Sequence, residues 1–345
     1  VWNPDNCIQC NRCSYVCPHA VIRPVALTEE EAAKAPEGLQ TLKMTGMDGY
    51  QFAMVISSLD CTGCGSCANV CPGKKGAKAL TMEPAESTLE GQKYFDYAVE
   101  LPEKTDVVAK FKETTVKGSQ FKKPLLEFSG ACAGCGETPY AKLITQLFGD
   151  RMYIANATGC SSIWGNSSPS TPYTVNAKGQ GPAWSNSLFE DNAEFGYGML
   201  LAQNALRDGL KEKVEAVMAN EKASDEVKEA CQNWLDTFGC GATNGTATDK
   251  LVSVLEGIDC DICKEIVKNK DFLAKKSQWV FGGDGWGYDI GFGGVDHVLA
   301  SGKDINVMIF DTEVYSNTGG QASKATPTGA IAQFAAGGKE VKKKD

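Results

Sequence analysis

Two copies of one cysteine pattern near the start of the sequence constrain its fold more than any other feature. Each copy reads C-x2-C-x2-C-x3-C-P, and the eight cysteines are Cys7, Cys10, Cys13, Cys17, Cys61, Cys64, Cys67 and Cys71. The two-residue spacing lets three thiolates surround one face of a [4Fe–4S] cube, and the proline turns the chain after the fourth. The sequence therefore predicts two iron–sulfur clusters near its N-terminus.

The doubled pattern resembles bacterial two-cluster ferredoxins, in which each fourth cysteine binds the other cluster. The first cluster is then bound by Cys7, Cys10, Cys13 and Cys71, and the second by Cys61, Cys64, Cys67 and Cys17. Two zinc sites with four thiolates each are the alternative. Glu29–Lys34 favours a helix and Tyr50–Ile56 favours a strand. We therefore expect an α+β, ferredoxin-like two-cluster domain with an insertion and a linker over residues 1–122.

A different pattern extends from residue 123 to residue 345. Gln278–Phe281 and Ile305–Phe310 are short apolar runs with β propensity, and Tyr288–Ala300 between them has helical spacing. Two buried parallel strands joined by a helix form a β-α-β unit. Phe195–Val217 and residues 220–276 also have helical spacing. The second domain is therefore predicted to be α/β, with a largely parallel sheet.

Polar and glycine-rich sequence follows both predicted strands. Asp284 lies between Gly283 and Gly285, and Thr312 and Val314 follow the second strand. Open α/β sheets bind ligands at the carboxyl ends of their strands, where glycines let backbone amides approach a phosphate. A carboxylate, a hydroxyl and a backbone carbonyl are oxygen ligands that suit Mg²⁺. These residues favour a magnesium-diphosphate site, and a glycine-rich turn without a metal is the alternative.

Two segments carry a resemblance to a known family. Residues 282–302, GGDGWGYDIGFGGVDHVLASG, and 311–330, DTEVYSNTGGQASKATPTGA, resemble the thiamine-diphosphate domain of the pyruvate:ferredoxin (flavodoxin) oxidoreductases. The resemblance implies that Asp284, Thr312 and Val314 hold Mg²⁺. It also implies that Asn317 lies beside the reacting carbon as a catalytic residue. The implied cofactor contacts are Glu137, Cys160, Gly283, Asp284, Gly285, Trp286, Thr312, Glu313, Val314, Tyr315, Ser316 and Asn317.

Three further cysteines predict a third cluster. Cys132 and Cys135 precede the predicted helix Thr138–Phe148, and Cys160 follows the predicted strand Met152–Ala155. Such positions converge at one edge of a parallel sheet, so we expect the three thiolates beside the thiamine site. A redox dithiol or a chance C-x2-C is the alternative. The resemblance implies a [4Fe–4S] cluster whose fourth ligand lies outside this chain. The alternative is a fourth ligand from this chain, for which the remaining cysteines are Cys231, Cys240, Cys260 and Cys263.

Composition limits the partners and the compartment. The 345 residues carry a formal net charge of −9, which argues against nucleic acid and anionic membrane as partners. No apolar run has transmembrane length, and no signal peptide is visible. Fifteen cysteines in these spacings favour metal ligation in a reducing cytoplasm. Because the chain starts with Val1 and ends with Gly337–Asp345 soon after a helix-like run, we interpret it as a piece of a longer polypeptide.

Two parts of the sequence leave structural alternatives open. Residues 156–186 are rich in Ser, Gly, Pro and Asn and are predicted to contain no regular element. They form either a disordered linker or, as their aromatic residues favour, an active-site loop pinned by Trp164, Tyr173 and Trp184. His19 either bonds near a cluster sulfur or lies exposed in a loop.

The resemblance implies a thiamine-dependent oxidative decarboxylation of pyruvate to acetyl-CoA and CO₂. No flavin or nicotinamide fingerprint is visible, so we expect electrons to leave through the clusters to ferredoxin or flavodoxin. Coenzyme A and substrate would bind to N-terminal domains that this chain lacks. The complete enzyme would be a homodimer, and this fragment would be inactive alone. Two alternatives stay open: another 2-oxo acid:ferredoxin oxidoreductase, acting on indolepyruvate or 2-oxoglutarate, and a non-catalytic electron-transfer module.

Overall fold

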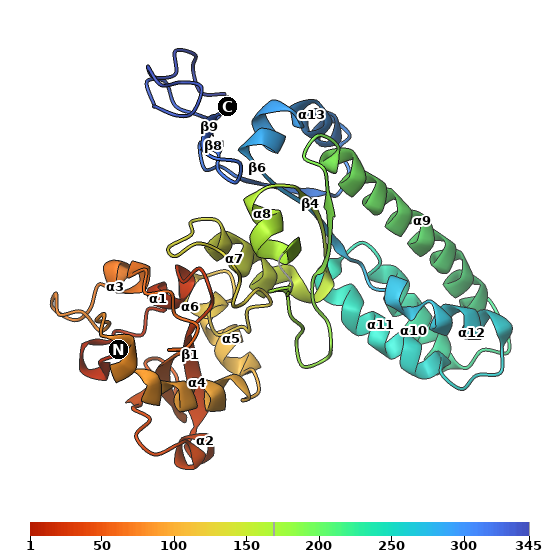
Figure 1. Cartoon of the computed structure of the whole chain (residues 1–345). Coiled ribbons are helices and arrows are strands. Elements are labelled where there is room, and N and C mark those ends of the chain that lie inside the picture. Colours follow the sequence, from red (N-terminus) through yellow and green to blue (C-terminus); the bar gives the residue numbers. More distant parts are fainter. Residues whose placement is uncertain (168–169, 345) are drawn as a thin grey trace. The chain divides into compact units, whose positions relative to one another are not determined.

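The computed structural model describes residues 1–167 and 170–344 and divides the chain into two compact units. The first unit joins Val1–Asp150 to Ile163–Pro182, and the second joins Arg151–Ser162 to Ala183–Asp345. Figure 1 gives the order of the elements along the chain. The first unit extends beyond residue 122, the predicted end of the ferredoxin-type domain, and the domain boundary itself stays a prediction.

The first unit is built on a small antiparallel sheet. Its strands are β1 (Ile22–Thr28), β2 (Leu42–Lys43) and β3 (Tyr50–Ile56), in the order β1-β3-β2. The bounds of β3 are those predicted from its alternating pattern. Phe52 in the middle of β3 is fully buried and meets the rings of Trp2 and Phe121 edge-on, at centroid distances of 6.1 and 6.4 Å. These aromatic contacts fix the face of the sheet that covers the cysteine loops.

The helices of the first unit are short. They are α1 (Arg12–Tyr15), α2 (Glu29–Lys34), α3 (Ser66–Val70), α4 (Gln92–Val99), α5 (Thr105–Phe111), α6 (Val116–Ser119) and α7 (Thr138–Phe148), with the turns η1 (Pro4–Asn6), η2 (Ala85–Ser87), η3 (Leu89–Gly91), η4 (Gly149–Arg151) and η5 (Ile163–Ser167). Both α2 and α7 have the bounds predicted from sequence. A reciprocal capping box between Thr28 and Glu31 begins α2, because each side chain satisfies a backbone amide of the other residue.

The second unit contains the predicted parallel sheet. Its strands are β4 (Met152–Ala157), β5 (Ala183–Ser187), β6 (Ser277–Gly283) and β7 (Asn306–Phe310), and they run in the order β5-β4-β6-β7 with every neighbouring pair parallel. Beyond β7, the short strands β8 (Val314–Tyr315) and β9 (Gln321–Ala322) form an antiparallel pair. The structure therefore confirms the two strands predicted on either side of the Gly-Asp-Gly segment.

The prediction that residues 156–186 contain no regular element is wrong. They include most of β5, which pairs with β4 and places Trp184 opposite Ile154. An edge strand has one neighbour and needs few apolar side chains, so a Ser- and Asn-rich sequence gave no strand signal. Trp164 and Tyr173, in the first unit, are buried, which confirms the pinned loop at those two residues. Residues 168 and 169 of the segment lie outside the described residues.

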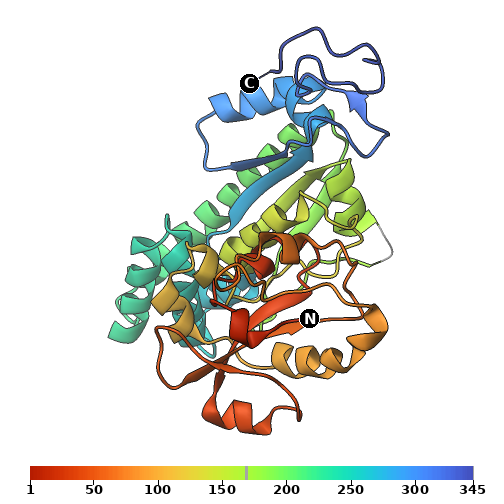
Figure 2. The same cartoon turned by 90° about the vertical axis from the view of Figure 1, so that its left-hand side faces the viewer.

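Helices of the second unit cover the sheet and extend away from it. They are α8 (Cys160–Ser162), α9 (Asn192–Met218), α10 (Asp225–Asp236), α11 (Gly241–Leu255), α12 (Asp261–Lys268) and α13 (Phe292–Ala300), with the turns η6 (Lys270–Phe272) and η7 (Gly285–Asp289). A Cβ on Gly196 of α9 would lie 2.5 Å from Val280, so helix and strand approach too closely for any side chain there. Figures 1 and 2 show α9 running from β4 and β6 to α10, α11 and α12.

The helix predicted over Tyr288–Ala300 begins later than its spacing suggested. Glycines and aromatics at residues 285–289 form the π turn η7, and α13 starts only at Phe292. Val295 and Val298 are buried as a helical core face should be, whereas Leu299 is 60% exposed. No helix among the described residues combines the length and the apolar character that a membrane crossing needs, and this includes α9 with its 27 residues.

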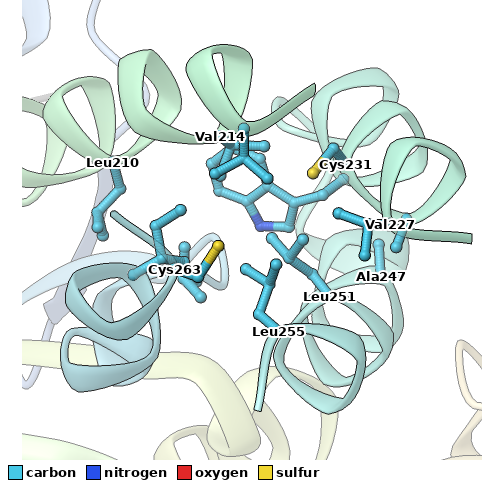
Figure 3. Close-up of a cluster of buried hydrophobic side chains, with 13 residues drawn as sticks. Leu210, Val214, Val227, Cys231, Ala247, Leu251, Leu255 and Cys263 are labelled. Carbon is cyan, nitrogen blue, oxygen red and sulfur yellow. The ribbon is translucent and has the colours of Figure 1, made fainter. Parts of the chain in front are cut away.

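The helical stretch predicted over residues 220–276 forms a separate core with α9. Figure 3 shows side chains from α9, α10, α11 and α12 meeting in one apolar cluster. Trp234 of α10 is fully buried in this cluster, and its Nε1 donates a hydrogen bond to Thr248 Oγ1 at 3.1 Å. The predicted ligands for metal and cofactor all lie elsewhere, so this core has a structural role.

Replacing Trp234 by Ala should lower the free energy of unfolding by about 3–5 kcal/mol, because it leaves a large cavity and an unpaired Thr248 hydroxyl. Denaturant titration followed by circular dichroism measures the loss. Iron per folded chain should not change. Phe334→Ala is the control, since this ring is 93% exposed. Equal destabilisation by both changes would contradict the assignment of this core.

Candidate metal and cofactor sites

Two cavities of the first unit are each lined by four cysteines. One, of about 430 Å³, is lined by Cys17, Cys61, Cys64 and Cys67. A smaller one is lined by Cys7, Cys10, Cys13 and Cys71. All eight thiols are free, and no three His, Cys, Asp or Glu side chains of the described residues are placed to hold a single metal ion. The assignment of each cysteine to a cluster stays a prediction, and this grouping supports it.

The two cysteine loops share an unusual backbone. The residues on either side of the second cysteine have positive φ in both copies: Gln9 (56°) and Asn11 (60°) in the first, Gly63 (69°) and Gly65 (76°) in the second. Left-handed residues curl a loop so that its amides face inward, as in other anion-binding loops. The Gln9 amide accordingly donates to Cys7 Sγ at 3.4 Å. Both loops are therefore shaped to surround thiolate sulfur.

Side chains support the first loop in this strained shape. Glycine adopts positive φ without cost, but Gln9 and Asn11 do not. Gln9 Nε2 donates to the Lys43 carbonyl at 2.9 Å, and its Oε1 accepts from the Thr45 amide at 2.8 Å. Asn11 Nδ2 donates to the Lys117 carbonyl at 2.9 Å. Strand β2 and helix α6 thus hold the first loop in place.

The cysteines affect one another's protonation, both within a set and between the two sets. Burial raises the pKa of Cys13, and the neighbouring sulfurs of Cys10, Cys67 and Cys7 raise it further. Burial and the same kind of repulsion raise the pKa of Cys67 to about 11. Iron binds thiolates, so loading a cluster must remove these protons and supply positive charge. The donor sets fit [4Fe–4S] clusters, which provide that charge.

His19 is not an exposed loop residue, so that alternative is wrong. It is 4% exposed and lines the larger cysteine cavity together with Cys17. Its Nδ1 lies 3.1 Å from the Ser129 carbonyl oxygen. Its Nε2 is buried with no hydrogen-bond partner among the described residues. A buried polar atom at this cavity fits a hydrogen bond to a cluster sulfur.

The Cys132–Cys135 loop repeats part of this geometry. Gly134, which precedes Cys135, has a positive φ of 73°. The residue before the second cysteine also has positive φ in the other two loops. The Glu137 amide donates to Cys135 Sγ at 3.4 Å, and the Glu137 carboxylate accepts from Trp164 Nε1 at 2.7 Å. These residues belong to the first unit, whereas Cys160 begins α8 in the second. A cluster shared by the three cysteines stays a prediction.

The predicted magnesium ligands meet at the carboxyl ends of β6 and β7. Asp284 Oδ2 accepts hydrogen bonds from the Thr312 amide at 3.0 Å and the Thr312 hydroxyl at 2.8 Å. The same hydroxyl lies 3.2 Å from the Val314 carbonyl oxygen and 2.7 Å from Ser316 Oγ. The structure therefore brings a carboxylate, a hydroxyl and a carbonyl together, as the sequence predicted.

The Asp284 carboxylate lacks a partner that a cation could supply. Its side chain is 2% exposed, and its Oδ1 is buried with no hydrogen-bond donor among the described residues. Burial raises its pKa to about 6, and Asp311 nearby adds to the shift while Thr312 opposes it. Burying a carboxylate is costly unless it is paired or binds a metal. Together these features fit Mg²⁺ at Asp284, Thr312 and Val314.

Sequence reasoning missed two carboxylates that organise this site. Asp289 accepts hydrogen bonds from Ser323 Oγ at 2.6 Å and the Lys324 amide at 3.1 Å, so it anchors the loop after β9. Asp311 accepts from Tyr288 at 3.1 Å and pairs with Lys343 at 2.8 Å. The position of Asp311 at the end of the predicted second strand was a usable signal.

The remaining predicted cofactor residues lie around this point but differ in exposure. Trp286 is 1% exposed, and its indole N–H has no partner in the described part of the chain. Tyr315 is half-buried, while Ser316 and Asn317 are exposed. Glu313 adopts a left-handed φ of 68°. The role of each in binding thiamine diphosphate, and of Asn317 in catalysis, stays a prediction.

Gly285→Ala should weaken binding of thiamine diphosphate with Mg²⁺ by at least about tenfold. A Cβ there would lie 2.3 Å from the Tyr315 ring and would push β8 away from β6. Calorimetric titration of the metal and cofactor measures the effect. Gly293→Ala in α13 is the matched control, because a Cβ there meets nothing within 4 Å. Equal affinity in the two variants would contradict the predicted contact surface.

Comparison with known proteins finds similarity over the whole length of the chain. A family model described as a 4Fe-4S dicluster domain matches residues 6–77. The whole chain is 54% identical to the pyruvate-flavodoxin oxidoreductase of Klebsiella pneumoniae and 55% identical to the pyruvate:ferredoxin oxidoreductase of Moorella thermoacetica. Over its whole length the chain is similar to one portion of the pyruvate:ferredoxin (flavodoxin) oxidoreductases. It spans 29% and 30% of the length of these two relatives and therefore corresponds to a portion of such an enzyme.

More distant relatives share the same portion. The chain is 47% identical over its full length to the pyruvate dehydrogenase [NADP(+)] of Euglena gracilis, of which it covers 19%. The dicluster match settles the choice between iron–sulfur and zinc for the doubled cysteine pattern in favour of iron–sulfur. This family portion thus combines a two-cluster electron-transfer domain with an α/β region that carries a parallel sheet.

Proposed function

We propose that the polypeptide containing this chain catalyses the CoA-dependent oxidative decarboxylation of pyruvate. This chain would supply the electron-transfer domain and part of the thiamine-diphosphate site. The observation that carries the proposal is the buried Asp284 carboxylate, which has a free Oδ1 beside Thr312 and Val314 in a chain that also holds a dicluster domain.

The reaction balances with two one-electron acceptors. Pyruvate and coenzyme A give acetyl-CoA, CO₂ and a proton, and two electrons pass to two carriers. Thiamine diphosphate, when bound, stabilises the electron pair left by the departing CO₂. Asp284, Thr312 and Val314 would hold its Mg²⁺, and the exposed Asn317 would lie beside the reacting carbon. Substrate and coenzyme A would bind to other domains, and the complete enzyme would be a homodimer.

Electrons would leave through iron–sulfur clusters to ferredoxin or flavodoxin. Cys132, Cys135 and Cys160 would bind the cluster nearest the thiamine, with a fourth ligand outside this chain. The left-handed Gly134 and the Glu137 N–H···S bond support this role, because both features recur in the ferredoxin-type loops. The two clusters of the first unit would then carry electrons onward, one at a time.

The second candidate function is the same oxidation of pyruvate with a different electron acceptor. Two relatives, 47% and 46% identical over 100% and 99% of this chain, are named as NADP(+)-linked pyruvate dehydrogenases. The same portion could therefore pass electrons to a nicotinamide through another domain. The names of these relatives all specify pyruvate, which favours pyruvate over indolepyruvate or 2-oxoglutarate.

The test is a steady-state assay of the complete polypeptide with coenzyme A and each candidate carrier. We expect pyruvate to give faster carrier reduction than 2-oxoglutarate or indolepyruvate, with one CO₂ released per two electrons. Equal rates with the other 2-oxo acids would reject pyruvate as the substrate. Reduction of NADP⁺ without ferredoxin or flavodoxin would favour the second candidate. No thiamine binding to the complete protein would leave only the electron-transfer role.

A further inference from the structure

Helix α7 turns a polar face toward the core of the first unit. The buried residues along it include Thr138, Lys142, Thr145 and Gln146, whereas its apolar Tyr140 is 58% exposed. The usual amphipathic helix does the opposite. Polar groups in a core are retained where they have specific partners, so the contacts of this face indicate what it does.

The most buried of these groups is Lys142. Its side chain is 1% exposed, and its Nζ donates hydrogen bonds to the Ser14 carbonyl oxygen and, at 3.4 Å, to the Cys17 carbonyl oxygen. Ser14 follows Cys13 directly, so the amine lies between cysteines assigned to two different clusters. Lys142 lies 125 residues after Cys17 in the sequence.

The Lys142 charge has no carboxylate to neutralise it in the described part of the chain. Its hydrogen-bond partners there are the two carbonyl groups. Arg23, another cation of the same unit, differs because it forms an ion pair with Glu127. An uncompensated buried cation is costly, so a nearby negative group must offset it.

We propose that Lys142 is a fixed positive charge that raises the reduction potential of the two clusters of the dicluster domain. A [4Fe–4S] cluster with four thiolates becomes more negative when it is reduced, so a nearby cation stabilises the reduced form. A unit charge within about 10 Å, at an effective dielectric constant of about 20, changes such an equilibrium at least tenfold. Lys142 acts through its charge and is not a catalytic residue. The proposal requires the clusters but does not depend on which 2-oxo acid is the substrate.

The test compares midpoint potentials of the cluster-loaded protein and its Lys142→Met variant, measured by redox titration with electron paramagnetic resonance. We expect both clusters to become harder to reduce, and at least one of them by about tenfold, a shift of about 59 mV to more negative potential for one electron. Lys142→Arg keeps the charge and should restore most of the potential. Lys34→Gln is the control, because this exposed lysine of α2 pairs with Glu30.

Three results would overturn the proposal. The first is unchanged potentials in Lys142→Met with full iron content. The second is an equal shift in Lys142→Arg, since loss of packing would then be the cause. If Lys142→Met loses iron, Lys142→Gln replaces it in the test, because the Gln amide is neutral and can still donate hydrogen bonds. Unchanged potentials in Lys142→Gln are the third result that would overturn the proposal. Pyruvate oxidation is measured separately, so failure of the proposed function would not be confused with any of these results.

Discussion

Replacing Cys17 by Ala is expected to remove the cluster bound by Cys61, Cys64 and Cys67. The cluster bound by Cys7, Cys10 and Cys13, which precede Cys17 in the sequence, should remain. Iron should fall by about four atoms per chain, because one complete cube is lost. The reason is structural, since Cys17 lines the same cavity as Cys61, Cys64 and Cys67. Iron and sulfide analysis with electron paramagnetic resonance measures the loss.

Double variants make this prediction decisive. Adding Cys61→Ala to Cys17→Ala should remove no further iron, because both changes act on one cluster. Adding Cys7→Ala to Cys17→Ala should remove about four more irons, because Cys7 lines the other cavity. If clusters followed sequence order, the two outcomes would be exchanged. Cys231→Ala is the control, since this buried thiol lies in the helical core of the second unit and should cost no iron.

The second large effect is expected at Asp284. Asp284→Asn should weaken binding of thiamine diphosphate with Mg²⁺ by at least about 100-fold, or ~3 kcal/mol, because a charged oxygen ligand of the ion is lost. Calorimetric titration measures it. Iron content should not change. Asp296→Asn is the matched control, because this carboxylate of α13 is exposed. Wild-type affinity in Asp284→Asn would remove the magnesium site from the proposed function.

Asp284→Asn should weaken metal and cofactor binding but should increase the stability of the metal-free protein. The pKa of Asp284 is raised from 3.8 to about 6 by burial, so the folded state binds its proton more tightly than the unfolded state does. The free energy of unfolding therefore falls as pH rises through that window. At pH 7 the metal-free Asn variant should be more stable than wild type, by on the order of 1 kcal/mol. The difference should vanish below about pH 4, and denaturant titrations at both pH values measure it.

Local sequence patterns predicted several of the regular elements. The charged run at Glu29–Lys34 and the alternating run at Tyr50–Ile56 have the observed bounds of α2 and β3. β5 was missed because an exposed edge strand of Ser and Asn has no apolar alternation. The π turn at Gly285–Asp289 was missed because its glycines and aromatics fit a helical period without forming an α-helix.

The residues of the candidate sites also divide into those that the sequence predicted and those that it did not. Cysteine spacing indicated three thiolates for each cluster, and the resemblance to two-cluster ferredoxins supplied the fourth. The Asp284–Thr312 contact followed from their places at neighbouring strand ends. Lys142 had no local signal, because its partners lie more than a hundred residues away and are backbone carbonyls. Sequence periodicity could not indicate a helix that buries its polar face.

The unequal support of the two cysteine loops has a consequence for biosynthesis. The loop with Gly63 and Gly65 can adopt its curved shape as soon as it leaves the ribosome, because glycine needs no outside help to do so. The other loop depends on Asn11 bonding to the Lys117 carbonyl, 106 residues later in the chain. Its final shape must therefore wait until α6 has been translated. The contact that supports Asn11 is therefore made only after both cysteine runs have been synthesised.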